Sequence, residues 1–117
     1  MRRKALLAVM AVIMSLGIMQ AAWAVGGTVT IRFNHDTEVF HGKVESPNME
    51  CRIGRAVKLY KVTADGRQLQ GKIRTSDSGS WKIELMHAHG NYIAIAPKFE
   101  AMHATCDGLV SSTLDVM

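Results

Sequence analysis

Turn-forming residues recur along this chain at short and regular intervals, and this spacing leaves little room for long helices. The clusters begin 12–18 residues apart, which leaves room for the short strands of an all-β domain between them. No segment between the clusters has the periodicity of an amphipathic helix. The clusters are Asn34-His35-Asp36, Ser46-Pro47-Asn48, Ala64-Asp65-Gly66, Ser76-Asp77-Ser78-Gly79, His89-Gly90-Asn91 and Asp107-Gly108.

The segments between these turns are short and rich in β-branched and aromatic residues. Segments 28–33 and 80–86 alternate apolar and polar residues, so each would present one apolar face to a core. Segment 97–105 has no clear period and is interpreted as a loop or a short helix. We therefore predict an all-β, seven-stranded Greek-key β-sandwich. The predicted strands are 28–33, 39–44, 55–62, 69–75, 80–86, 92–96 and 109–116.

The first 24 residues have the three parts of a secretory signal peptide. Arg2-Arg3-Lys4 is a positive start, an apolar run follows, and Ala22 and Ala24 flank a bulky residue as a cleavage site requires. A membrane anchor is the alternative, but the apolar run is shorter than the ~20 residues that span a bilayer. We predict cleavage after Ala24 and a single exported domain, 25–117, which is periplasmic or extracellular. We expect no stable membrane insertion after cleavage.

The positive charge of the whole chain comes largely from this leader. The formal net charge is +4, and three of the 14 basic residues but none of the 10 acidic residues lie in segment 1–24. The predicted mature domain is therefore almost neutral. A nearly neutral domain has no general attraction to polyanions, so we expect no nucleic-acid partner.

Two cysteines, Cys51 and Cys106, both lie in the predicted mature domain. Two cysteines in an exported chain most often form one disulfide. Closing a loop of this length would stabilise the fold by about 4 kcal/mol in the chain-entropy account. A metal pair or a redox pair is the alternative, although the two residues do not form a C-x-x-C motif.

Four consecutive pieces of the chain carry a resemblance to a known module. The pieces are Gly42-Lys43-Val44, segment 55–60, segment 75–83 and segment 90–95. In this order they resemble the transthyretin-like (prealbumin-like) sandwich of carboxypeptidase regulatory-like and Cna B-type domains. In that family a G-x-V strand, an A-x-V-x-L strand, a T-x-x-x-G-x-[FW] turn and a G-x-Y strand follow one another. The resemblance covers Phe40 to about Lys98.

The resemblance implies a rigid binding, stalk or accessory module. Its framework would be the Asp77-Ser78-Gly79 turn, a core built on Trp81, and the cysteine pair. Hydroxyisourate hydrolases share this fold but end in a Tyr-Arg-Gly-Ser tail, whereas this chain ends at 112–117 without one. We therefore expect a non-enzymatic module at the cell envelope or outside the cell. Its partner would be a protein or an envelope glycan that the sequence does not identify.

His87-Ala88-His89 suggests an alternative function. Residues two apart in an extended segment point the same way, so His87 and His89 could bind one copper or zinc ion. His35-Asp36, or Met102 with His103, could add ligands. The competing interpretation is a pair of exposed loop histidines with no cofactor.

The middle of the chain also carries a run of basic residues opposed by a single acid, Asp65. On one sheet they would form a basic face for an acidic glycan or another envelope polymer. The competing interpretation is a set of solvated strand positions that discourage edge pairing. The residues are Arg52, Arg55, Lys58, Lys61, Arg67, Lys72 and Arg74.

Overall fold

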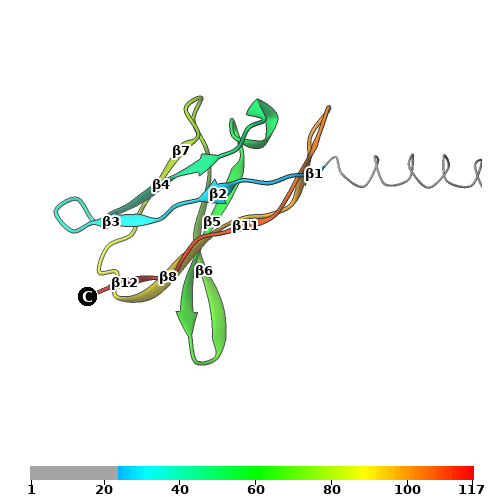
Figure 1. The fold of residues 1–117 in the computed structure, drawn as a ribbon. Helices are drawn as coiled ribbons and strands as arrows, with labels where there is room; N and C mark the ends of the chain where they lie inside the picture. Colours follow the sequence, from blue (N-terminus) through cyan, green and yellow to red (C-terminus); the bar gives the residue numbers. More distant parts are fainter. Residues whose placement is uncertain (1–23) are drawn as a thin grey trace, which may run out of the picture.

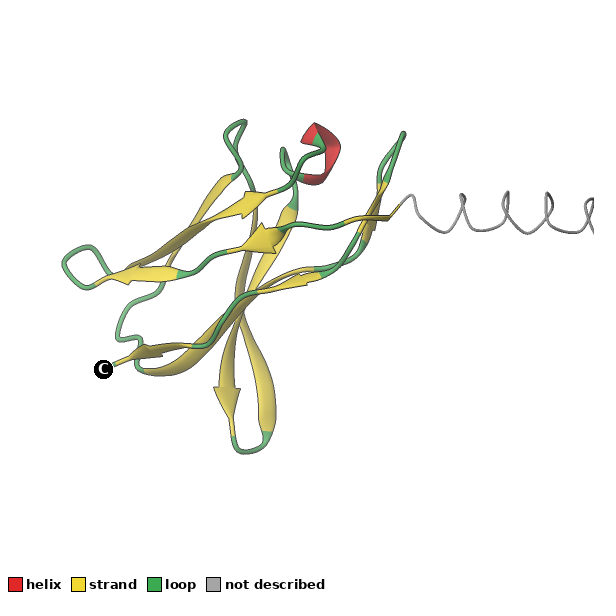
Figure 2. Cartoon of the chain, viewed as in Figure 1, coloured by secondary structure: helices red, strands yellow, loops and turns green. Residues whose placement is uncertain are grey.

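The computed structural model describes residues 24–117. Nearly all of the predicted signal peptide therefore lies outside the described residues. The described elements are short strands and one 3-10 turn (Figures 1 and 2). They are β1 (Ala24–Val25), β2 (Thr28–Val29), β3 (Arg32–Asn34), β4 (Val39–Glu45), η1 (Met49–Cys51), β5 (Ala56–Thr63), β6 (Gly66–Arg74), β7 (Ser80–Glu84), β8 (Gly90–Ala96), β9 (Phe99–Glu100), β10 (Thr105–Cys106), β11 (Leu109–Val110) and β12 (Leu114–Val116).

Two antiparallel sheets pack face to face, as in a β-sandwich (Figure 1). The five-stranded sheet has the order β11-β8-β5-β6, and β12 also pairs with β8. In the four-stranded sheet β2 and β3 pair with one edge of β4, and β7 pairs with the other. A small third sheet, β1-β10-β9, lies at one end. The predicted all-β class is thus confirmed.

The strand boundaries differ in detail from those predicted. The described chain has twelve strands rather than seven, because segment 28–33 divides into β2 and β3 and segment 109–116 into β11 and β12. Segment 97–105, expected to be a loop or a short helix, instead carries β9 and the start of β10. These strands are only two residues long, too short to give an alternating pattern. The one helical turn lies elsewhere, in η1, where the Asn48 side chain accepts a hydrogen bond from Glu50 N.

Apolar side chains from the inner faces of both sheets form the core. Phe40 of β4 and Tyr92 of β8 meet across the sandwich with ring centroids 4.6 Å apart. Trp81 of β7 is 3% exposed, so its large apolar surface is almost entirely buried. The remaining buried members of this cluster are Val29, Ile31, Val44, Val57, Leu59, Ala94, Ala96, Leu109 and Val116.

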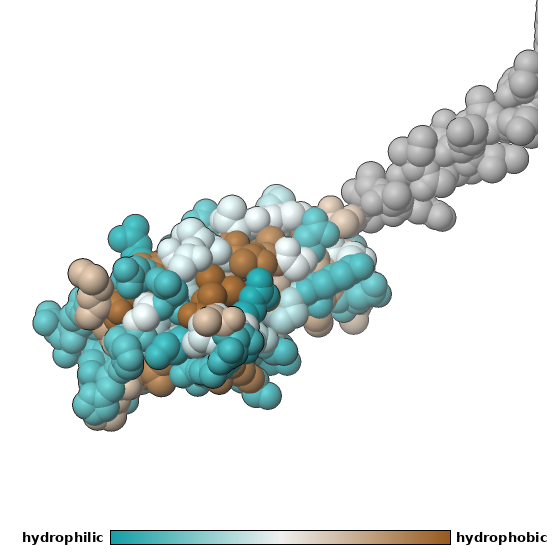
Figure 3. Space-filling view, turned by 90° about the horizontal axis from the view of Figure 1, so that it is seen from below, coloured by the Kyte–Doolittle hydropathy of each residue, from teal (hydrophilic) through white to brown (hydrophobic). Residues whose placement is uncertain are grey.

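The outer face of the five-stranded sheet is partly apolar. The register pairs Tyr60 with Ile93 and Ile95 with Val110, and each pair shares one face of the sheet. Ile93 is buried but is not part of the core cluster, in keeping with this outer position. The view from below shows hydrophobic residues in the middle of the visible surface, bordered by hydrophilic ones (Figure 3).

A disulfide joins Cys51 of η1 to Cys106 of β10, with an S–S distance of 2.00 Å. This confirms the predicted bond. It ties η1 to the small sheet at one end of the sandwich. A disulfide indicates an oxidising compartment, which supports export. Within residues 24–117 we find no helix that is long and apolar enough to span a membrane.

Arg55 is buried next to this disulfide. Its Nη1 donates to Cys51 O at 2.9 Å, and its Nη2 donates to Pro97 O at 3.0 Å and Asp107 O at 2.6 Å. Burial lowers the pKa of the guanidinium, and the nearby Asp107 carboxylate partly opposes that shift. With 2% of its surface exposed, Arg55 is not part of an exposed basic face, contrary to expectation. It instead connects three backbone segments around the disulfide.

Candidate functional site

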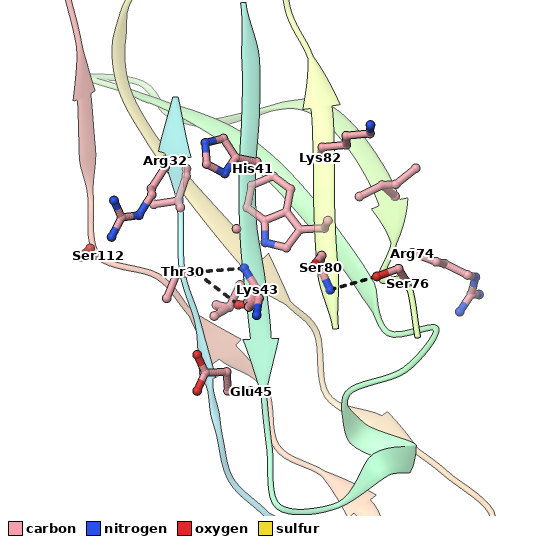
Figure 4. A pocket seen from close by; sticks show the side chains of 15 residues that line it. Thr30, Arg32, His41, Lys43, Glu45, Arg74, Ser76, Ser80, Lys82 and Ser112 are labelled. Carbon is pink, nitrogen blue, oxygen red and sulfur yellow. Dashed lines mark hydrogen bonds between the residues drawn. The ribbon is translucent and has the colours of Figure 1, made fainter. Parts of the chain in front are cut away.

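A groove of about 1160 Å³ lies along the four-stranded sheet and reaches the end of β6 (Figure 4). Strand β4 runs through it, with β3 on one side and β7 on the other. Side chains alternate along a strand, so the β4 residues that neighbour the buried ones point outward into this groove. The polar residues that line it are Thr30, Arg32, His41, Lys43, Glu45, Arg74, Ser76, Ser80, Lys82 and Ser112.

Three basic residues form a row across the sheet. His41 of β4 is in register with Arg32 of β3 and with Lys82 of β7. All three are exposed, and directly opposed residues have Cβ atoms about 4.5–5.5 Å apart. Arg32 and Lys82 carry the positive charge of the row and lie on either side of the His41 imidazole. The row therefore presents two cations and an imidazole to one side of the sheet.

Lys43 extends the basic surface along β4. It is in register with Ser80 of β7, and its backbone N–H donates to Thr30 Oγ1 at 2.9 Å. Thr30 N donates in turn to Lys43 O at 2.9 Å. These two bonds continue the pairing with β4 through Thr30, which lies between β2 and β3. Because Lys43 is also in register with Ser80 of β7, its backbone is held from both sides.

The cations of the groove have no direct ion-pair partner in the described chain. Among residues 24–117 the single ion pair joins Glu50 and His103, which lie outside the groove. Glu45 is the one acidic residue that lines the groove, against Arg32, Lys43, Arg74 and Lys82. The groove therefore carries a positive charge that is open to an anion.

Trp81 lines the same groove and has an unpaired donor. Its Nε1 is buried and has no hydrogen-bond partner among the described residues. It lies beside Gly42, its register partner on β4.

Three serine hydroxyls lie next to the basic residues. Ser78 Oγ is 3.0 Å from both Ser76 Oγ and Ser80 Oγ, within the turn between β6 and β7. Ser76 and Ser80 line the groove, whereas Ser78 lines a second hollow of about 540 Å³ together with Lys43 and Arg52. The hydroxyls thus form a polar ridge between two hollows that both contain basic side chains.

The two histidines predicted to bind a metal lie in the loop before β8. His87 N donates to Glu38 Oε1 at 3.1 Å, and His89 Nδ1 lies 3.3 Å from His87 O. In the described part of the chain no three His, Cys, Asp or Glu side chains are grouped so that they could hold a metal ion. Although the Glu38 carboxylate contacts the His87 backbone, no third side chain of these types is grouped with both imidazoles in the described residues.

The predicted basic run does not form one surface. Lys58 and Lys72 face each other on β5 and β6, on the five-stranded sheet. Of the run, Arg74 reaches the groove and Arg52 lines the second hollow. The groove is instead built mainly from basic residues that sequence reasoning missed, because they lie in three separate segments. The sequence signal that could have found them is the alternation of polar and apolar residues, because each of them is next to an apolar residue that points into the core.

Outside the groove, Glu50 and His103 form a polar contact near the disulfide. Glu50 Oε1 lies 2.6 Å from His103 Nδ1, and Oε2 accepts a hydrogen bond from His103 N at 2.9 Å. The bond from the His103 side chain is the main cause that lowers the pKa of Glu50. The carboxylate is therefore held in its charged form.

Comparison with known protein families, curated proteins and solved structures found no match to this chain.

Proposed function

We propose that this protein is an exported, non-catalytic β-sandwich module that binds an anionic ligand in the groove on its four-stranded sheet. The observation that carries the proposal is the row formed by Arg32, His41 and Lys82, with Lys43 beside it. These side chains point to one side of the sheet without an ion-pair partner among residues 24–117. An anion laid across the row would form charge-assisted hydrogen bonds with Arg32, Lys43 and Lys82.

An acidic glycan of the cell envelope is the ligand class that fits this groove best. Its carboxylate or sulfate groups would meet the basic row, and its hydroxyls would meet Ser76 and Ser80, which line the same groove. Sugars need such neutral hydrogen-bond partners beside the charged ones. An acidic protein segment would use the charges but not the hydroxyls.

The proposal also includes the protein family, the signal peptide and the compartment. The family is the transthyretin-like group with Greek-key connections, and segment 1–24 is a signal peptide that is removed on export. The disulfide between Cys51 and Cys106 supports an oxidising compartment, either the periplasm or the space outside the cell.

A binding role agrees better than catalysis with the bonding of the groove hydroxyls. Ser76 and Ser80 both bond to Ser78, and no hydrogen bond joins these hydroxyls to an imidazole in the described chain. A serine nucleophile needs a base within hydrogen-bond reach. Metal binding through His87 and His89 stays an alternative proposal, without a third ligand to favour it.

Binding to polyanions of defined chemistry tests this function. Polygalacturonate supplies carboxylates, dextran sulfate supplies sulfates, and neutral dextran is the control polymer. We expect the protein to bind the anionic polymers, with an affinity that falls as salt is added. The triple variant Arg32→Gln/Lys43→Gln/Lys82→Gln should bind at least about tenfold more weakly, since each charged hydrogen bond is worth about 1.5–3 kcal/mol.

The matched control is Lys58→Gln/Lys72→Gln, which removes two opposed charges from the other sheet. It should bind like the unaltered protein. If both variants lose affinity to the same degree, binding follows net charge and the groove is not the site. Polyglutamate is the acidic peptide for comparison; if it binds and neither polygalacturonate nor dextran sulfate does, the glycan assignment is wrong.

A further inference from the structure

Side chains of types that can bind a metal also lie near the disulfide, away from the groove. Met102 and His103 occupy the tip of the β9–β10 hairpin, which is closed by the bond from Ala101 N to Ala104 O at 2.8 Å. Met49 begins η1 and directly precedes Glu50, whose side chain contacts that tip. The disulfide, with Cα atoms 5.4 Å apart, fixes η1 and the hairpin against each other.

Glu50 holds His103 in a defined orientation. Its carboxylate binds both the backbone N–H and Nδ1 of His103, so the ring cannot turn without breaking a contact. Nδ1 is occupied, which leaves Nε2 as the free ring nitrogen. The His103 side chain is 74% exposed, so this nitrogen is accessible. A carboxylate that binds one ring nitrogen while the other ligates an ion is a common arrangement around protein-bound metals.

Two methionines flank this contact without filling the core. Met49 is 61% exposed and Met102 is 88% exposed. Each is the chain neighbour of one member of the Glu50–His103 contact, and consecutive Cα atoms lie about 3.8 Å apart. A methionine has three rotatable side-chain bonds, so each thioether has the freedom to turn toward an ion held at His103 Nε2.

We propose that Met49, Met102 and His103 bind one Cu(I) ion, with Glu50 as the residue that positions His103. Thioether sulfur is a soft ligand that selects Cu(I) over zinc. Both cysteines of the chain are in the disulfide, so thioethers are the soft ligands that remain. This site is distinct from the groove and from the His87–His89 pair, and it does not depend on the proposed function.

Competition for Cu(I) tests the site on the purified protein. The probe is Cu(I) as its coloured bicinchoninate complex, kept reduced with ascorbate, which leaves the disulfide intact. We expect the protein to withdraw one Cu(I) per chain and to shift the ¹³C methyl NMR signals of Met49 and Met102. Met49→Leu/Met102→Leu should abolish the withdrawal. Glu50→Gln should weaken it by about 10- to 100-fold, as expected for the partner of a ligating histidine.

The control variants remove equivalent groups elsewhere. Met86 is 63% exposed and precedes His87, so Met86→Leu removes a comparable thioether from the other histidine loop. Met86→Leu and His87→Ala/His89→Ala should both bind Cu(I) like the unaltered protein. Failure of the unaltered protein to compete would overturn the proposal. Retention of Cu(I) by Met49→Leu/Met102→Leu, or an equal loss in either control, would place binding elsewhere and overturn it as well.

Discussion

Trp81 and Gly42 face each other across β7 and β4, and the indole Nε1 lies where a side chain at position 42 would need room. A Cβ built on Gly42 would be 2.9 Å from Nε1 and would overlap the carbonyl oxygen of Thr30. The Thr30 backbone is itself fixed by its bonds to Lys43. Glycine at position 42 thus allows the chain segment between β2 and β3 to lie close against β4.

We predict that Gly42→Ala destabilises the fold by about 1–3 kcal/mol, because the added methyl group must displace a backbone carbonyl that cannot move freely. Urea unfolding measures the change. Gly26→Ala is the matched control, since the nearest atom to its Cβ is Asp107 Oδ2 at 3.9 Å. The control should change stability by less than about 0.5 kcal/mol. Equal effects of the two substitutions would contradict the account of Gly42.

A second prediction concerns the buried guanidinium. Arg55→Met leaves the carbonyls of Cys51, Pro97 and Asp107 without their donor. Each buried acceptor that loses its partner costs about 1–3 kcal/mol, so we expect a loss of at least about 2 kcal/mol. Thermal and urea unfolding both measure it. Arg67→Met removes an exposed arginine from β6 and should be nearly neutral. A stable Arg55→Met protein would show that Arg55 is not a structural connector.

A third prediction concerns the disulfide. Cys51→Ala/Cys106→Ala opens a loop with a sequence separation of 55 residues. The chain-entropy account then gives a loss of about 4 kcal/mol in the free energy of unfolding. The oxidised protein should be the most stable in unfolding measurements. The reduced protein and the double variant should both be less stable, by similar amounts. Three superimposed curves would mean that the bond contributes nothing to stability.

The sequence predicted those features that depend on local alternation. Segment 80–86 alternates clearly, and β7 is found within it, with Trp81 facing the core. The cysteine pair was also predicted, because only two cysteines are present in the predicted mature domain.

The candidate site was missed because it depends on strand register. Arg32 and His41 lie on consecutive strands, whereas Lys82 is distant in the sequence, and the three come together through pairing of β3 and β7 with β4. Arg55 lies two residues before Val57, so both side chains point to the inward face of the same segment. Arg55 is therefore buried and not exposed as expected. Pairing partners and the burial of a charged strand residue are tertiary properties, so composition and spacing do not determine them.

Residue-resolved NMR titration with an acidic oligosaccharide tests the central claim most directly. Addition of oligogalacturonate to ¹⁵N-labelled protein should shift the amide signals of Arg32, His41, Lys43, Ser80 and Lys82, and these shifts should diminish as salt is added. The signals of Lys58 and Lys72 on the opposite sheet should stay in place. Shifts confined to the five-stranded sheet, or spread evenly over all basic residues, would contradict the proposal that the groove is the binding site.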